Sequence, residues 1–448
     1  MKHYGNYVEP HRQLILDALD YIWKNPEPGY KEWKTHAYLE EAFAKLGYAL
    51  TLAGDIPGFY TEIDTGCPGP TVAVFGELDS LVNAGHPDAD PETGAVHCCG
   101  HCAQSAALLG LAAALTEPGV LDGLCGKIRL VAVPAEELIE VEFRTELRNK
   151  GTIRYFGGKQ EFLYRGLLDG VDLAFMQHTS PGAAAYVDGR WNGCIAKTIT
   201  YEGVSAHAGG APHQGVNALY AANLGLNAIN ALRETFQDDS HIRVHPIITS
   251  GGQSVNAIPA AVRLESYVRG KTVEDITTVN HKVNRALAAT AAAMGGNVHL
   301  TDTPGYMPEV DDRNMMELAG QAMRLFFDEV YVRPDACTTG CTDMGDISCV
   351  MPATQFHIPG ASGKSHGEDY QIADPDAAAV SAAKVMLAML ALLLKDEAAA
   401  AKQVLAEHTP VFASYADYFR TMDDMFLDRQ AVTYVENGDV QLSFVKGE

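Results

Sequence analysis

Two imidazoles and three thiols fall within six residues of this chain, in the segment His97-Cys98-Cys99-Gly100-His101-Cys102. The segment follows a strand-like run that ends in Glu77-Leu78-Asp79, and it precedes an apolar helical pattern that begins near Ala106. Thiolate and imidazole bind borderline-soft divalent metals, and a thiolate at the start of a helix can also attack disulfides. The segment therefore predicts either a metal site or a redox site.

Further candidate ligands lie at the ends of apolar strand-like runs. Asp79 follows the run 71–75, Glu136-Glu137 follow 127–133, His178 follows 171–176, and His366 lies in the late loop 363–369. In open α/β sheets, ligands bind at the carboxyl ends of the strands, so we expect these groups to converge. Two divalent ions about 3.5–4 Å apart can activate a bridging water there, and a buried glutamate pair suits a general base.

Each of these residues also has a simpler interpretation. Paired glutamates after Pro134 are typical of a solvated helix start, and a single histidine at a strand end is more often a capped polar residue. We interpret Cys98 and Cys102 as thiols that fill the core. The scattered cysteines are interpreted as structural: Cys67, Cys125, Cys194, Cys337, Cys341 and Cys349.

The elements that must position these residues indicate an α/β fold with an insertion. Uniformly apolar strands alternate with helices up to about Pro181, which is typical of strands buried on both faces of a sheet. The order then changes to strand 195–201, helix 214–236, strands 241–249 and 261–268, helix 273–294 and strand 298–301, the ferredoxin-like β-α-β-β-α-β order. We expect a discontinuous catalytic domain with a mixed sheet, residues 1–192 and 305–448, and an inserted lid or dimerisation domain, residues 193–304.

Composition restricts the class of partner. The chain has 448 residues with 57 acidic and 33 basic side chains, and its formal net charge is −24. Nucleic acids and anionic membranes require clustered basic residues, so neither is expected as a partner. No apolar run is expected to be long enough to span a bilayer. Nine cysteines, an odd number concentrated around one segment, argue against a disulfide framework and favour the cytoplasm.

Five motifs together resemble the M20 metallopeptidases, most closely the amidohydrolase branch of aminobenzoyl-glutamate hydrolase-like and N-acyl-amino-acid hydrolases. The resemblance covers most of the chain, from about Asn25 to beyond His366. The motifs occur in the order seen in that family: Cys99-Gly100-His101, Pro134 to Glu137, Ser205 to Gly209, Gly251 to Pro259, and Asp343 to Ser348. Taken alone, the glycine-containing stretches 203–210 and 251–259 also fit simple connecting loops.

The resemblance implies a role for each site residue. It implies two divalent metal ions per chain, Zn or Mn, bound by Cys99, His101, Glu137, His178 and His366. Glu136 would be the general base, and Asp79 would orient a ligand. His207, Asn256 and Arg269 on the inserted domain would bind the substrate carboxylate and polarise the scissile carbonyl. The family uses that domain to form a homodimer, in which its histidine can reach the active site of the partner.

Two features depart from the family pattern. Cys102 stands where many relatives carry an acidic or amide residue, and a charged stretch, 138–158, follows the paired glutamates in place of glycines. The stretch either reshapes the substrate entrance or forms a solvated helix. The C-terminal residues 409–448 have no counterpart in the pattern.

The sequence therefore predicts a metal-dependent hydrolase that cleaves the amide bond of an N-acyl amino acid or a dipeptide. Two alternatives from other classes remain at this point. Cys99 and Cys102 form a Cys-x-x-Cys motif that would suit a thiol-disulfide oxidoreductase, although the short domain typical of such proteins is missing. The other alternative is a catalytically silent M20-like binding protein.

Overall fold

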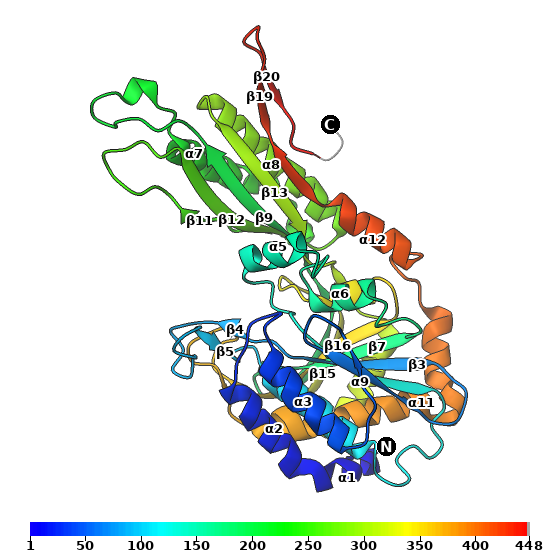
Figure 1. Cartoon of the computed structure of the whole chain (residues 1–448). Coiled ribbons are helices and arrows are strands. Elements are labelled where there is room, and N and C mark those ends of the chain that lie inside the picture. Colours follow the sequence, from blue (N-terminus) through cyan, green and yellow to red (C-terminus); the bar gives the residue numbers. More distant parts are fainter. Residues whose placement is uncertain (446–448) are drawn as a thin grey trace. The chain divides into compact units, whose positions relative to one another are not determined.

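The computed structural model describes residues 1–445, which divide into two compact units (Figure 1). Unit 1 consists of residues 1–190, 309–336 and 342–411. Unit 2 consists of residues 191–308 and 337–341 together with the chain from residue 412 onward. The inserted domain expected at 193–304 thus lies within unit 2, and the candidate metal ligands lie within unit 1.

Unit 1 is built on a ten-stranded mixed sheet with the order β1-β2-β6-β3-β7-β16-β8-β14, to which β15 adds beside β8 and β17 beside β16. Strand β3 runs parallel to β6 and β7, and β7 runs parallel to β16, so four carboxyl ends share one edge. Strands β2 and β8 are antiparallel to their neighbours, which confirms the mixed sheet. The strands are β1 Thr51–Leu52, β2 Phe59–Asp64, β3 Thr71–Glu77, β6 Lys127–Val133, β7 Leu173–Pro181, β8 Ala185–Trp191, β14 Glu309–Val310, β15 Val330–Thr338, β16 Ala353–Ser362 and β17 Gln371–Ile372.

Helices cover this sheet and pack on one another, as α11 does beside α9 (Figure 1). Helix α4 is buried along its whole length, which explains its almost continuous apolar sequence. Gly100 precedes it with a φ of 97°, a left-handed conformation that favours glycine. The helices of unit 1 are α1 Gly5–Val8, α2 Arg12–Lys24, α3 Trp33–Lys45, α4 His101–Ala114, α5 Val141–Asn149, α6 Gly158–Tyr164, α9 Arg313–Met323, α10 Met344–Ser348 and α11 Ala382–Glu407, and a small sheet pairs β4 Leu81–Val82 with β5 Ala95–Val96.

The expectation that no apolar run is long enough to span a bilayer was wrong. The helical stretch Asp376–Glu407 is long and apolar enough by composition to cross a membrane. However, 78% of its most apolar window is buried inside the structure, which is the behaviour of a core helix.

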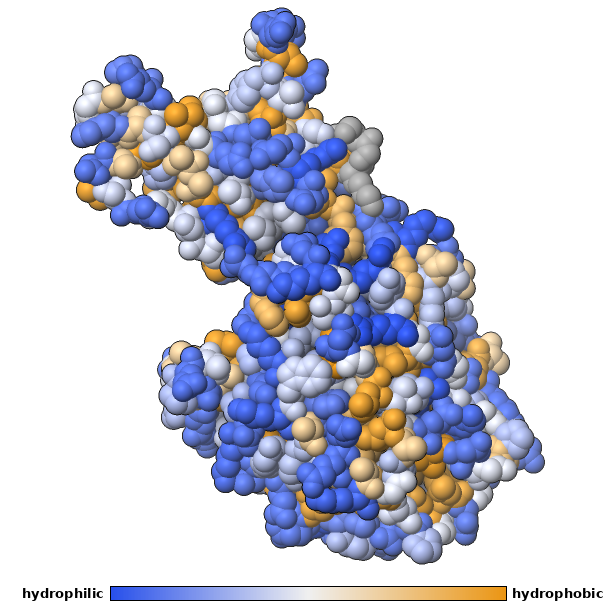
Figure 2. Space-filling model, in the orientation of Figure 1, coloured by the Kyte–Doolittle hydropathy of each residue, from blue (hydrophilic) through white to orange (hydrophobic). Residues whose placement is uncertain are grey.

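Hydrophilic residues dominate the visible surface, and hydrophobic residues are scattered among them (Figure 2).

Unit 2 has the ferredoxin-like order that the sequence predicts. Its sheet runs β10-β12-β9-β13-β18, with β11 also beside β12, and helices α7 and α8 lie side by side against it (Figure 1). Ile199, Val262 and Leu264 from the sheet share a hydrophobic core with Val283 and Leu287 from α8. The elements are β9 Gly193–Glu202, α7 Ala218–Leu232, β10 Arg243–Val244, β11 Ile247–Ser250, β12 Ala261–Gly270, α8 Val273–Ala293, β13 Asn297–Pro304, α12 Tyr415–Asp424, β18 Leu427–Gln430, and the hairpin β19 Val432–Tyr434 with β20 Val440–Leu442.

The C-terminal segment differs from the expected domain division, which assigned all of 305–448 to the catalytic domain. Strand β18 pairs antiparallel with β13, placing Arg429 opposite Leu300. Leu427, Ala431 and Val432 are buried in the core of unit 2. The physical reason is that the edge of β13 offers unpaired backbone groups, and the apolar residues of the tail bury themselves there.

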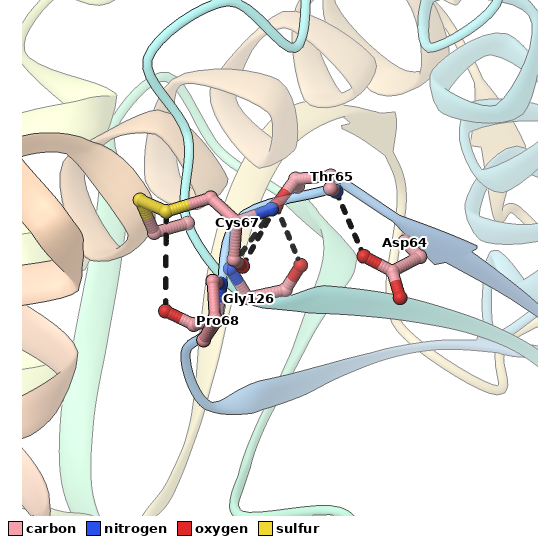
Figure 3. Close-up of a disulfide and its surroundings, with 7 residues drawn as sticks. Asp64, Thr65, Cys67, Pro68 and Gly126 are labelled. Carbon is pink, nitrogen blue, oxygen red and sulfur yellow. Dashed lines mark hydrogen bonds between the residues drawn. A yellow bond between two sulfur atoms is a disulfide. The ribbon is translucent and has the colours of Figure 1, made fainter.

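A disulfide joins Cys67 to Cys125 (Figure 3). From the sequence, these two cysteines are interpreted only as structural. The disulfide links the loop after β2 to the loop before β6, and these two strands are antiparallel neighbours. The Gly126 N–H donates to the Cys67 carbonyl at 2.8 Å, and the Thr65 hydroxyl donates to the Gly126 carbonyl at 2.8 Å. The expectation of a chain without a disulfide framework is thus wrong for this pair.

Candidate metal centre

The chemistry-bearing residues of unit 1 converge at the shared edge of the sheet. Asp79 follows β3, Glu136 and Glu137 follow β6, and His366 lies in the loop after β16. His178 was expected after its strand, but β7 continues to Pro181 and carries this histidine within it. The first turn of the buried helix α4 supplies the remaining imidazole, which completes the cluster.

Two groups of potential metal ligands share one thiol. The donor atoms of Cys99, His101 and His178 lie within 4.8 Å of one another, and so do those of Cys99, Glu137 and His366. The Cys99 Sγ atom is 3.4 Å from His178 Nε2, and Glu137 Oε1 is 3.5 Å from His366 Nε2. The two groups thus have the Cys99 thiol in common, and each could hold a divalent metal ion.

Neighbouring groups orient these side chains. The carboxylate Oδ1 of Asp79 lies 3.0 Å from His101 Nδ1, and its Oδ2 accepts the Glu137 N–H at 2.8 Å. His178 Nδ1 lies 2.8 Å from the Thr179 carbonyl. A metal-binding histidine usually donates its second ring nitrogen in this way, which fixes its tautomer.

The residues fit a divalent metal by their chemistry. Glu137 Oε1 is buried and has no hydrogen-bond partner among the described residues, which is costly unless a cation binds there. Burial and the nearby His101 lower the pKa of His178 to about 4, so this imidazole is neutral, the form that binds metal. Thiolate, imidazole and carboxylate together suit a borderline-soft ion.

Glu136 lies beside both groups and is 8% exposed. Burial and the carboxylates of Glu77 and Glu137 raise its pKa well above the usual range. Its Oε2 atom is 3.9 Å from His101 Nε2. A carboxylate in this environment is a stronger base than an exposed one, so it can accept a proton from water.

A buried ion cluster behind the candidate ligands was missed from the sequence. The Lys159 Nζ atom lies 2.5 Å from Glu77 Oε1 and 2.5 Å from Asp343 Oδ1, and all three side chains are fully buried. Glu77 Oε2 in turn lies 3.3 Å from His101 Nε2. The available signal was a charged residue at the end of a strand that is otherwise apolar enough to be buried on both faces.

The surroundings of Cys99 and Cys102 do not support a thiol-disulfide oxidoreductase. Burial raises the pKa of the Cys102 thiol to about 12, and burial together with Glu137 raises that of Cys99 well above its usual value. Exchange-active thiols need a depressed pKa and access to solvent. Cys102 is fully buried in the main hydrophobic core, as the sequence predicts.

The three expected substrate-binding residues of the inserted domain are only partly brought together. His207 and Asn256 lie on adjacent exposed loops, where the Ala208 N–H donates to the Asn256 carbonyl at 2.9 Å. Arg269 lies instead on β12, opposite Cys194 in the register with β9 and partly buried. Within unit 2, therefore, His207 and Asn256 form one cluster and Arg269 lies elsewhere on the sheet.

The charged stretch that departs from the family pattern contains the short helix α5, whose one buried residue is Arg144. The rest of the helix is exposed or partly buried, as the solvated-helix alternative predicts. The guanidinium of Arg144 contacts backbone carbonyls beside Glu136. The stretch is thus more than a solvated helix at Arg144 and at its buried end, which includes Tyr155 and Phe156.

Comparison with known proteins agrees with this geometry. Residues 192–294 match the model of the M20 peptidase dimerisation domain. The structure resembles a dinuclear metal-binding peptidase of the M20 family from Bacillus subtilis, with a TM-score of 0.64 over 86% of this chain and 99% of that one at 19% identity. The chain therefore carries an M20 peptidase dimerisation domain. The insertion that the family model matches is the ferredoxin-like part of unit 2.

Other named hydrolases are similar over most of the chain. Xaa-Arg dipeptidase of Mus musculus is 28% identical over 369 residues, covering 78% of this chain and 77% of its own. One of the subunits of p-aminobenzoyl-glutamate hydrolase of Escherichia coli is 28% identical over 296 residues, covering 64% of this chain and 57% of its own. The aminobenzoyl-glutamate utilization protein of Klebsiella pneumoniae has the same fold, with a TM-score of 0.64 over 86% of this chain and 97% of that one at 18% identity.

Proposed function

We propose that this protein is a metal-dependent amidohydrolase that cleaves the amide bond of an N-acyl amino acid or a dipeptide. The observation that carries the proposal is the pair of ligand groups that share Cys99, with Glu136 beside them. The similar proteins named above include a dipeptidase and an aminobenzoyl-glutamate hydrolase, which supports a substrate with an amide bond next to an amino acid.

Cys99, His101 and His178 would hold one metal ion, and Cys99, Glu137 and His366 the other. We propose Zn or Mn, because both accept this mixture of thiolate, imidazole and carboxylate. When bound, such ions lower the pKa of water and polarise a carbonyl oxygen. Asp79 would keep the His101 ring in place through its 3.0 Å contact with Nδ1.

The protein side of the reaction centres on Glu136. Its carboxylate would take a proton from the attacking water and then give that proton to the leaving amine. The buried surroundings suit this role, because a raised pKa makes the carboxylate a stronger base and keeps the transferred proton on it until the amine leaves. Expulsion of water from the substrate-bound site would strengthen these electrostatic contacts.

On unit 2 we propose that His207, Asn256 and Arg269 bind the carboxylate of the substrate, with His207 also stabilising the developing oxyanion. Imidazole, amide and guanidinium groups all donate hydrogen bonds to anionic oxygens. The acidic net charge of −24 supports a small-molecule partner over nucleic acid or a membrane. We propose a cytoplasmic location, because an odd number of cysteines concentrated around one segment argues against a secreted disulfide framework.

We further propose a homodimer through unit 2. All four residues of β11 are exposed, including Ile247 and Ile248, and β11 pairs with β12 alone among the described strands. Helix α7 exposes Tyr220 and Leu224. An apolar edge strand beside an apolar helix face is suited to pairing with a second copy. The replacement Ile248→Lys should give monomers in light scattering, whereas Lys282→Gln on the neighbouring helix α8 should not.

The first test is the metal content of the purified protein, measured by elemental mass spectrometry after a Zn or Mn soak and desalting. Two ions per chain, together with hydrolysis of N-acetyl amino acids, dipeptides or aminobenzoyl-glutamate, is the expected result. A chain that holds no metal and hydrolyses none of these amides would contradict the proposal.

Mixing Glu136→Ala chains with His207→Ala chains tests where His207 acts. Activity recovered in the mixed dimer would mean that His207 of one protomer serves its partner. Verified mixed dimers without activity would mean that it acts within its own chain.

A further inference from the structure

The charged stretch 138–158 departs from the pattern of the family. It places a single fully buried charged side chain next to the peptide that carries Glu136. We propose that this residue, Arg144 on α5, is a positioning residue that fixes the backbone on both sides of Glu136. The inference rests on the proposed function, in which Glu136 is the general base. The proposal gives a role to the charged stretch 138–158.

The guanidinium of Arg144 reaches the carbonyls that flank Glu136. Nη2 donates to the Glu137 carbonyl, and Nη1 lies 3.5 Å from the Ala135 carbonyl. Nη1 also donates to the Phe156 carbonyl at 2.7 Å, so the end of the charged stretch contacts the same guanidinium. Arg144 thus connects the end of the charged stretch, at Phe156, to the backbone on both sides of Glu136.

The amide groups of the same peptide are held from the other side. The Ala135 N–H donates to Glu32 Oε1 at 2.8 Å, and the Glu137 N–H donates to Asp79 Oδ2 at 2.8 Å. The residues before and after Glu136 therefore have both N–H and C=O groups bound by buried side chains. This arrangement directs the Glu136 side chain toward His101, one of the candidate metal ligands.

The backbone at this point needs such support. Ala135 has a φ of 57°, in the left-handed region that non-glycine residues rarely adopt. Strained residues of this kind persist where the surrounding structure holds them in place. Gly58 and Gly29 pack against this turn without side chains, and a Cβ at Gly29 would collide with Arg144 Nη2.

Only a guanidinium suits the contacts. Arg144 is 0% exposed, and its planar fork of donors serves several carbonyls at once. Its Cζ atom also lies 5.5 Å from the centre of the Tyr30 ring, which limits movement of the group. A lysine at this position would keep the charge, but its ammonium is a point donor that cannot span the same three oxygens.

The test compares Arg144→Lys and Arg144→Met with Lys150→Gln, which removes an exposed cation from the end of the same helical segment. Each variant is saturated with Zn or Mn, and its metal content, thermal midpoint, kcat and KM are measured on the best amide substrate. We expect kcat of Arg144→Lys to fall about 100-fold, the effect of a small misplacement of a reacting group, with KM and metal content unchanged. Amide hydrogen exchange of a peptide covering 133–138 should become faster than in Lys150→Gln.

Two results would overturn the inference. One is Arg144→Lys with the kcat and the exchange rate of the unmodified enzyme. The other is a loss of kcat that follows the loss of metal or of folded protein in both Arg144 variants, because Arg144 would then be a general structural residue. An unmodified enzyme that binds two metals but hydrolyses no amide would contradict the proposed function, and the exchange measurement would still decide whether Arg144 fixes the peptide.

Discussion

Among the residues that the structure describes, each unit buries one lysine among polar side chains, and the two clusters differ in charge. In unit 1, Lys159 lies between the carboxylates of Glu77 and Asp343, next to the candidate metal ligand His101. In unit 2, Lys197 donates to Asn280 and Asn284 at 2.8 and 2.5 Å and also to the carboxylate of Asp302.

The difference shows in the pKa of each lysine. Burial lowers the pKa of Lys197, and only Asp302 opposes the shift. Burial also acts on Lys159, but Asp343 and Glu77 outweigh it and raise its pKa. The cluster in unit 2 is nearly neutral and complete in itself, because the Asn280 and Asn284 amides also donate to Asp302 at 2.7 Å. The cluster in unit 1 keeps an excess of carboxylate, which is what a site for divalent cations needs.

The largest effect should come from the carboxylate that acts on the substrate. Replacement Glu136→Gln should lower kcat by about 10²–10⁴-fold, because the amide cannot carry the proton, while metal content stays unchanged. The matched control is Asp302→Asn in the unit 2 cluster, which should leave kcat as it is. Steady-state kinetics and elemental analysis of the two variants check this. Near-normal turnover of Glu136→Gln would remove that residue from the mechanism.

The second prediction compares the two lysines directly. Replacement Lys159→Met leaves two buried carboxylates without their cation and should cost about 3–5 kcal/mol of unfolding free energy. Lys197→Met should cost less, because Asp302 keeps its two amide donors. Urea unfolding followed by circular dichroism, with a probe in each unit, measures both. Equal losses would mean that the charge difference between the clusters has no energetic consequence.

The third prediction concerns the shared thiol. Replacement Cys99→Ser should weaken metal binding by more than the roughly 10–100-fold loss typical of residues that only orient a ligand, because a hydroxyl group is a poor substitute for thiolate. Cys102→Ser removes a nearby thiol in the hydrophobic core, and it should leave metal affinity unchanged. Competition with a chelator measures both affinities. Equal metal affinity in the two variants would exclude Cys99 as a ligand.

The smallest expected effect is a pH dependence of stability in unit 1. Burial raises the pKa of Asp311 from 3.8 to about 7, beside Glu309. The folded state therefore binds more protons than the unfolded state between these two values, so stability should decrease as pH rises through this window.

Asp311→Asn should flatten that decrease between about pH 4 and about pH 7, whereas the exposed Asp328→Asn should not. Denaturant unfolding at several pH values measures the slope. A slope that is unchanged in Asp311→Asn would assign the pH dependence to other groups.

Much of the candidate site was predictable because it depends on strand direction. Polar residues that follow apolar strands, such as Asp79 and Glu136, must meet if the strands are parallel neighbours, and β3 and β6 are. The ferredoxin-like order of unit 2 was predictable for a similar reason, since the period of apolar residues changes between strands and helices. His178 was found despite an error in the end of its strand, because β7 still reaches the same edge.

The remaining contacts depend on pairs of residues far apart in the chain. Lys159 meets Glu77 and Asp343 across separations of 82 and 184 residues. Cys67 meets Cys125 because β2 and β6 are adjacent, and β18 joins β13 because that edge is open. No local sequence pattern specifies such partners, because a charged residue can pair with many different groups and an apolar residue can pack against many different surfaces.

The order of amino acids was enough to specify which residue types could bind metal, which strands carry them and how the elements of the inserted domain follow one another. These features come from side-chain chemistry and from the periods of helix and strand, which act locally. Long-range packing was needed to bring Cys99 into two ligand groups, to set Lys159 against the carboxylates behind them and to carry Arg144 to the peptide of Glu136. These arrangements depend on burial, because a buried charge or carbonyl must find a partner and only the packed fold determines which one is within reach.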